Sequence, residues 1–348
     1  MPATTPEPEL TTRVDLATPD GRRLNPAARG WSRHPLHRAN LRGSWGRTKR
    51  WDYWAVLAGD LVVSALVADI DYVGMAEVWW ADLATGATGG AELLRPLAVG
   101  IDLPEMAGTV PVRVRGRGLD LALRDDASGA THLAASWRDR DGRPGTLDVV
   151  VDLPPGHQSL NVVIPWTDRR FQYTSKHQAR PARGRVAVGD RTWVFGSDDR
   201  PAWGVLDVGR GRWPYTTRWN WGGGAGPATG ADDVVVGLQL GGRWTAGTGA
   251  TENGILVDGR LTKIGTELTW DYDWDAPLRP WRVHDPDGHL DVTLHPRHDE
   301  HSTVDLAVLR RETHQVFGTW TGWVRDADGR RLELDAVQGF AEESRARW

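Results

Sequence analysis

The residues with the most direct chemical potential are the carboxylates of the hexapeptide WDYDWD at positions 270–275. If this segment is a strand, Asp271, Asp273 and Asp275 share one face and the aromatic residues share the other, because side chains alternate along a strand. A carboxyl group desolvated beside aromatic rings has a raised pKa and can protonate an alkene or enol. Asp271 and Asp273 are therefore candidate catalytic acids. The alternative is a solvated acidic face, since carboxylates are seldom buried without a partner.

Lysine is rare, and its three occurrences lie in the dense motifs TKRWDYW, YTSKHQARP and VDGRLTKIG. The excess of Arg over Lys is typical of a GC-rich genome, which we take to be bacterial. A retained Lys can supply a compact ammonium with a shiftable pKa, which Arg cannot. Lys176 is the third candidate catalytic residue, and we expect it to be buried near a carboxylate. The alternative is a purely structural ion pair.

Tryptophan is abundant, with 20 Trp beside 4 Phe and 5 Tyr. Ligand pockets are mostly apolar with a few convergent polar groups, so the Trp-rich segments predict a cavity wall. The alternatives are a structural corner packed by Trp, or an exposed platform that stacks on sugars. The candidate ligand-binding residues come from RWDYW, QYTSKHQ, GRGRWPYTTRWNWGG and TEN: Trp51, Tyr53, Trp54, Tyr173, His177, Gln178, Arg210, Trp213, Tyr215, Arg218, Trp219, Asn220, Trp221, Glu252 and Asn253.

Several other kinds of site are excluded by residue type or context. The chain has no Cys, so disulfides and thiolate sites are absent. Ser175 has no elbow glycines, and the glycine run at 222–226 lacks the ending of a phosphate loop. The His-rich segment 289–301 invites a metal, but Pro296 predicts a hairpin loop without fixed ligand geometry. We therefore predict no metal site and no cofactor.

Charge and hydropathy limit the partners. The formal net charge is −4 and the pI is about 6.3, so no basic surface for nucleic acid is expected. The N-terminal segment has no apolar signal region, and no apolar run approaches the ~20 residues of a transmembrane helix. We predict a cytoplasmic protein without an integral membrane segment.

The elements that must position these residues are strands. Five Asp-Gly dipeptides punctuate alternating segments such as ILVDGRLTKI, and this is a strong hairpin signal. Helical signals are weak, so the fold class is all-β, of the sandwich or barrel kind. A chain of 348 residues exceeds the ~250 of a single barrel. We predict a disordered tail at 1–10, a first domain at 11–180 and a second domain at 181–348.

The succession of RTKRWDYWAV, FQYTSKHQARPARGRV, DVGRGRWPYTTRWNWGGGAG, WDYDWDAPLRPWRV and VFGTWTGWVRDADG resembles the domain-of-unknown-function family DUF2804 over nearly the whole chain after about residue 10. That family is distantly similar to the tandem lipocalin-like carotenoid hydratases of the hydroxyneurosporene synthase type and to some pericyclases. The resemblance implies two calycin-type barrels or curled sheets packed together. The hydratases are thought to use acidic residues without a cofactor, which favours the candidate acids.

Three functional hypotheses follow. The first is a binder of an apolar or amphiphilic small molecule, such as a lipid, terpenoid or polyketide, in a Trp-lined cavity. The second is a cofactor-free hydratase or isomerase that uses general acid–base catalysis. The third is a carbohydrate-binding module or glycoside hydrolase with exposed Trp and paired carboxylates.

Overall fold

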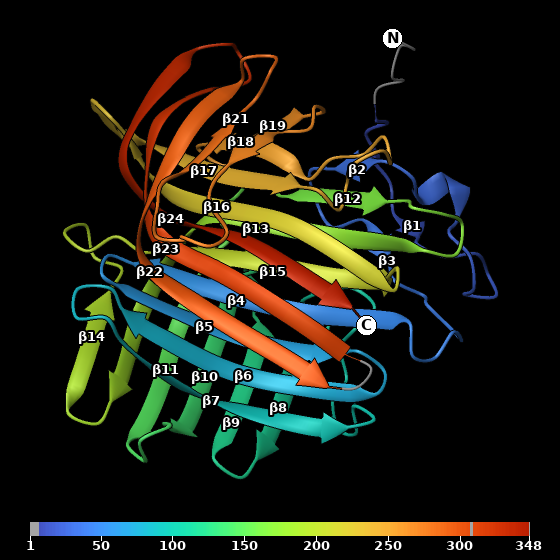
Figure 1. Cartoon of the computed structure of the whole chain (residues 1–348), viewed down its shortest axis with the longest axis horizontal. Coiled ribbons are helices and arrows are strands. Elements are labelled where there is room, and N and C mark those ends of the chain that lie inside the picture. The colour runs from blue at the N-terminus through green and yellow to red at the C-terminus, as the bar shows by residue number, and fades with distance from the viewer. Residues whose placement is uncertain (1–6, 307–308, 348) are drawn as a thin grey trace.

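The computed structural model describes residues 7–306 and 309–347, which form almost entirely antiparallel β-strands (Figure 1). This confirms the all-β prediction. Alternating apolar residues and tight Asp-Gly turns account for it, since neither feature suits a helix. Near the N-terminus a short 3₁₀ turn, η1 (Pro26–Ala28), lies beside the small parallel pair β1 (Val14–Asp15) and β3 (His37–Arg38).

The first large sheet has 13 strands and curls into a nearly closed barrel. The two sides of the opening approach each other where Arg95 Nη2 donates a hydrogen bond to the Arg115 carbonyl at 2.6 Å. Its members are β2 (Trp31–Ser32), β4 (Thr48–Ala58), β5 (Leu61–Asp69), β6 (Val73–Asp82), β7 (Ala87–Pro96), β8 (Val112–Gly116), β9 (Leu119–Asp125), β10 (Thr131–Arg138), β11 (Pro144–Val151), β12 (Leu160–Ile164), β13 (Phe171–Val188), β14 (Arg191–Phe195) and β15 (Trp203–Arg212).

The second sheet has nine strands and forms a curled half-barrel. Its long strands β22, β23 and β24 run diagonally across β4, β5 and β6 in Figure 1. Its members are β16 (Thr216–Ala228), β17 (Ala231–Gly242), β18 (Asn253–Val257), β19 (Arg260–Ile264), β20 (Thr269–Asp271), β21 (Trp281–His284), β22 (Leu290–Leu306), β23 (Leu309–Arg325) and β24 (Arg331–Arg347).

Strand β4 shows how alternation divides the packing between two cores. Trp54 and Val56 point into the first barrel and join its main apolar core. Ala55 and Leu57 point outward and pack with Phe317 and other residues of the second sheet. The outer wall of the first barrel is therefore buried against the second sheet, and both faces of β4 are apolar for different reasons.

The point at which the chain crosses from the first sheet to the second does not coincide with the predicted boundary between residues 180 and 181. That boundary falls inside β13, which is one continuous strand, and β15 beyond it still pairs with both β13 and β4. The chain leaves the first sheet after Arg212. The mostly apolar segment VLDV at 205–208 belongs to β15, which is part of the barrel wall, and the next strand, the glycine-rich β16, is the first strand of the second sheet.

The predicted disordered tail is only partly described. Residues 1–6 lie outside the described range. The side chain of Glu7 is only 7% exposed and forms an ion pair with Lys263 at 2.8 Å, and the Leu10 amide donates a hydrogen bond to the Trp31 carbonyl. Residues 7–10 are therefore held by the second sheet and by β2 rather than extending freely, because a buried acid requires a cationic partner.

The predicted hairpin loop around Pro296 is wrong. Residues 290–306 form the single long strand β22, and its register with β23 shifts between Pro296 and His298. A bulge at this point accommodates a residue that cannot donate to the ladder, which is where proline is tolerated in sheets.

Glycine makes room for the large indoles of neighbouring strands. A side-chain carbon at Gly209 would collide with the indole of Trp51 on the neighbouring strand β4, and one at Gly145 would collide with Trp137. The ring lies across the bare backbone in both cases. The high Gly and Trp contents are thus parts of one packing solution.

Candidate functional site

Two neighbouring residues of β13 point to opposite sides of the first barrel wall. His177 pairs across the ladder with Leu206 and faces the barrel interior, whereas Lys176 pairs with Asp207 and faces the second sheet. Alternation alone produces this separation. Lys176 and His177 therefore belong to two different environments, an interior pocket and an inter-sheet charge cluster.

The interior pocket has a volume of about 160 Å³. Trp54, Leu123, Leu153 and Leu206 supply apolar walls. Apolar walls with a few convergent polar groups are typical of small-molecule sites. The polar residues on the lining are His34, Asp52, Asp125, Thr131, His157, Ser159, His177 and Arg180.

His177 is buried and held by a polar network behind the pocket. Its Nε2 lies 3.0 Å from Ser175 Oγ, and Ser175 Oγ lies 2.6 Å from Asn161 Oδ1. The other ring nitrogen, Nδ1, is buried and makes no hydrogen bond to a described residue. Burial, followed by the positive charge of Arg180, holds the pKa of His177 well below its usual range, so the ring is neutral at pH 7.

Arg180 brings a buried positive charge to the same pocket. Its Nε donates to the Asp152 carbonyl at 2.8 Å and its Nη2 to two further carbonyls, while Nη1 has no hydrogen-bond partner among the described residues. The guanidinium lies 5.2 Å from the ring centre of Trp54, a cation–π distance. It forms no ion pair with a described carboxylate. Burial lowers the pKa of Arg180 to about 10.

A β-bulge turns Arg180 toward the pocket. The register between β13 and β15 shifts between His177 and Arg180, and Ala179 adopts φ +57°. Left-handed backbone is unfavourable for a residue with a side chain, and such bulges often re-aim side chains near functional sites. Without the extra residue, alternation would place Arg180 on the opposite face.

Two acids also line the pocket. Asp52 is paired with the buried Arg210 at 2.7 Å, so its charge is compensated. Asp125 accepts a hydrogen bond from Thr131 at 2.7 Å, and burial raises the pKa of Asp125. Asp125 is nevertheless exposed as a residue, so its carboxyl is only partly desolvated; the raised pKa still favours protonation, which is what a general acid requires.

The inter-sheet cluster surrounds Lys176 with acids. Lys176 Nζ lies 2.9 Å from Asp207 and 3.5 Å from Glu252, and it sits 4.1 Å from the ring centre of Trp221. Burial alone would lower the pKa of Lys176, but the two carboxylates raise it above its ordinary value. This confirms the expectation that Lys176 is buried beside a carboxylate.

Each acid of the cluster receives an indole N–H. Trp51 donates to Asp207 at 3.0 Å, Trp219 donates to Glu342 at 2.6 Å, and Trp244 donates to Glu252. Burial raises the pKa of Glu252 and of Glu342 to about 7 in each case. The tryptophans therefore serve as donors to buried carboxylates as well as packing volume.

The Trp set forms a packed interior rather than an open face. Trp54, Trp213 and Trp221 are buried, as expected, while Trp51 and Trp219 are half-buried. Trp213 stacks on Trp244 with a ring separation of 5.5 Å and meets Trp219 edge-on. Sugar stacking needs an accessible ring face, so these contacts do not favour the carbohydrate hypothesis.

The other predicted ligand-binding residues are dispersed. Gln178 hydrogen-bonds Gln239, Tyr53 reaches Gln315, and Asn253 receives the Gly241 amide, all at or near the inter-sheet layer. Tyr173 donates to Asn161 inside the first barrel, near Arg210. The remaining three lie away from the pocket: Tyr215 is exposed, Arg218 pairs with Glu343, and Asn220 donates to Tyr272.

Asp271 and Asp273 lie at the surface of the second sheet. Strand β20 ends at Asp271, and the Asp273 side chain accepts the Asp275 amide in a turn, so the predicted alternation through residue 275 is wrong. Asp273 also pairs with the exposed Arg279 at 3.0 Å, and Asp271 lies 3.6 Å from His284. Neither carboxyl has the desolvated surroundings that a general acid requires.

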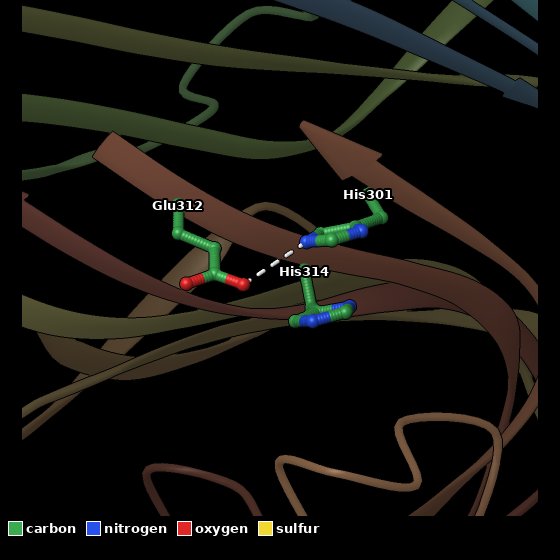
Figure 2. Close-up of side chains that lie close together, drawn as sticks. All are labelled: His301, Glu312 and His314. Carbon is green, nitrogen blue, oxygen red and sulfur yellow. Dashed lines mark hydrogen bonds and ion pairs between the residues drawn. The ribbon is translucent and has the colours of Figure 1, made fainter. Parts of the chain in front are cut away.

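A cluster of metal-ligand types occurs on β22 and β23 (Figure 2). One nitrogen or oxygen each from His301, Glu312 and His314 lie within 4.8 Å of one another, and His314 Nδ1 is 2.8 Å from Asp299. The two imidazoles are cross-strand partners and stack in parallel, 4.1 Å apart with an interplanar angle of 2°. The lone pair of an imidazole nitrogen lies in the plane of its ring, so the lone pairs of two stacked parallel rings lie in two separate planes and cannot meet at one ion without rotation of a ring.

Sequence reasoning missed Arg180, Asp125, Asp207 and Glu342. Asp207 carries a usable signal, because a single acid within the apolar run VLDV predicts a buried, paired carboxylate. Arg180 offers no such signal, since it is one of many arginines and its direction depends on the bulge.

Comparison with known proteins agrees with the fold. No curated protein sequence matches the chain significantly. Kievitone hydratase from Nectria haematococca is 12% identical, with 98% of each chain covered and a TM-score of 0.50. CghA with Sch210972 is also 12% identical, covers 87% of this chain and 89% of its own, and has a TM-score of 0.44. A putative AttH from Nitrosomonas europaea has the same identity and TM-score, with 85% and 92% covered.

At 12% identity, these structural similarities are evidence for the fold alone. The family assignment rests instead on the sequence, because residues 7–348 match the family described as "Domain of unknown function (DUF2804)". The chain therefore belongs to the DUF2804 family, as its motifs predict.

Proposed function

We propose that this protein binds a small molecule in the first-barrel pocket, with an apolar body and one anionic or carbonyl oxygen. The observation that carries the proposal is the buried guanidinium of Arg180, which lines the pocket and forms no ion pair with a described carboxylate, since Asp125 and Asp152 act on it only at longer range. A buried charge normally has a counter-charge, so a ligand oxygen that completes its hydrogen bonding is favoured.

The size of the pocket limits what it can hold. An apolar cavity of similar volume in another protein binds benzene, so 160 Å³ suits one ring or a short chain. A lipid, terpenoid or polyketide would place a ring-sized portion in this pocket. The binder hypothesis is thus favoured for a compact amphiphile or for one end of a larger one.

The test is native mass spectrometry of protein purified from its own host, followed by binding measurements with any copurified ligand. We expect Arg180→Met to weaken binding about tenfold or more, because a charge-assisted hydrogen bond is lost. Arg183→Met is the matched control, since Arg183 lies on the same strand but pairs with Asp152 at the surface. Equal affinity of the Arg180 variant and the control would contradict the proposal.

A second candidate function is cofactor-free lyase or isomerase chemistry in the same pocket. It is favoured by Asp125, whose pKa is raised by burial, together with the neutral His177. Asp125 would donate a proton and His177 would accept one. If so, Asp125→Asn abolishes turnover of the copurified ligand but leaves it bound, whereas in a carrier this variant changes nothing that can be measured.

A further inference from the structure

The polar network behind the pocket fixes the orientation of Asn161. Its Nδ2 lies 3.0 Å from the Ser32 carbonyl, 3.2 Å from the Ser159 carbonyl and 2.9 Å from Ser159 Oγ. Backbone carbonyls can only accept hydrogen bonds, so the donating nitrogen must face them. The Asn161 amide oxygen therefore points in the other direction, toward β13.

This orientation determines which proton each neighbour uses. Asn161 Oδ1 can only accept, and it lies 3.1 Å from Tyr173 OH and 2.6 Å from Ser175 Oγ. Ser175 has a single hydroxyl proton, which is committed to Asn161. At 3.0 Å from His177 Nε2, Ser175 Oγ can then only accept, so Nε2 carries the imidazole proton.

The tautomer of His177 follows directly. A neutral ring with its proton on Nε2 has a bare lone pair on Nδ1, and that nitrogen is buried without a partner among the described residues. An unsatisfied buried acceptor costs free energy, and such groups in folded proteins call for an explanation. His177 lines the pocket, but Nδ1 itself has almost no accessible surface, so a ligand donor reaches it only if the neighbouring side chains shift on binding.

We propose that His177 Nδ1 accepts a hydrogen bond from a hydroxyl or N–H group of the ligand. Combined with the oxygen bound by Arg180, this defines a ligand class: a small hydroxylated acid or enolic carbonyl compound with a ring-sized apolar body. The inference rests on the proposed function and specifies its ligand. Ser175 and Asn161 are positioning residues, since they act through His177.

The test uses four probes: 3-hydroxybenzoate, 4-hydroxybenzoate, benzoate and phenol. Calorimetric titration of the wild-type protein should show one hydroxybenzoate binding about tenfold more tightly than benzoate, because only the former satisfies Nδ1. In His177→Leu this preference should vanish while benzoate affinity is retained. In Arg180→Met the preference of hydroxybenzoate over phenol should vanish instead.

A second variant protects the test against a folding defect. Ser175→Ala removes the hydroxyl that accepts from His177 Nε2 and donates to Asn161 Oδ1, so it should reduce the hydroxyl preference at a modest cost in melting temperature, while the His177 ring itself is kept. Equal binding of benzoate and hydroxybenzoate by the wild-type protein, or a preference that survives in both His177→Leu and Ser175→Ala, would overturn the inference.

The two proposals can fail separately. If a copurified ligand binds in an Arg180-dependent way but none of the four probes shows a hydroxyl preference, the ligand class is wrong and the proposed function stands. If no ligand depends on Arg180, both are wrong.

Discussion

The buried cations on the two sides of β13 differ in whether they are ion-paired. On the outer side, the Lys176 ammonium has two carboxylates and an aromatic face, and each carboxylate has an indole donor. On the inner side, Arg180 forms no ion pair with a described carboxylate and His177 Nδ1 has no donor among the described residues, and both residues line the pocket. Glu252 Oε2 on the outer side also lacks a hydrogen bond of its own, so what separates the two sides is the ion pairing of the buried cation: Lys176 has two carboxylates, at 2.9 and 3.5 Å, and Arg180 has none among the described residues.

The largest effect should come from breaking the outer cluster. Lys176→Met removes the cation between Asp207 and Glu252 and leaves buried carboxylates uncompensated. We expect a loss of about 3–5 kcal/mol in unfolding free energy, measured by denaturant titration.

The combined variant Lys176→Met with Asp207→Asn and Glu252→Gln is the control, because it removes the charges together and should recover part of the loss. A single variant as stable as the wild type would show that the cluster is not structural.

The next effect concerns pH. Burial raises the pKa of Glu252 and Glu342 from 4.5 to about 7, so the folded state binds more protons than the unfolded state between these values. The stability contributed by these protons is fully present below about pH 4.5 and is lost as pH rises through about 7. These two groups should therefore lower the melting temperature between pH 5 and pH 8, against the opposite contribution of the buried His37 and His177, whose lowered pKa values favour the folded state as pH rises toward 6.5. In the double variant Glu252→Gln with Glu342→Gln the fall should be smaller, and an unchanged slope would exclude these two groups as its source.

The inner side should respond much less in stability. His177→Leu replaces a ring with an unsatisfied nitrogen by an apolar side chain, which is close to neutral for folding. We expect a change within about 1 kcal/mol by the same titration. A loss as large as that of Lys176→Met would mean that His177 is primarily structural and would remove the contrast between the two sides.

The smallest effect is expected at the surface acids. Asp271→Asn and Asp273→Asn remove exposed partners of His284 and Arg279, and exposed pairs contribute little. Stability should change by less than about 0.5 kcal/mol, and binding of any copurified ligand should be unaltered. A large loss of ligand turnover in either variant would instead restore WDYDWD as a catalytic segment.

Local patterns predicted the fold well and the site only in part. Alternation and Asp-Gly turns specify strands because they are properties of short segments, and the scarcity of lysine singled out Lys176 because it is a property of the composition. The pocket combines distant segments from His34 to Leu206, and their meeting depends on barrel closure. Arg180 faces inward through a bulge, and Pro296 is absorbed by another. Bulges shift register by one residue, which periodicity cannot reveal.

The glycine that faces each of these two indoles has a consequence for how the sequence can evolve. Because Gly209 lies under Trp51 and Gly145 under Trp137, either partner can change only if the other changes with it. Gly209→Ala should be as damaging as loss of the ring, and a smaller residue at position 51 should rescue it. The glycine and the tryptophan of each pair should therefore covary, so that family members lacking the tryptophan also lack the need for glycine at the facing position.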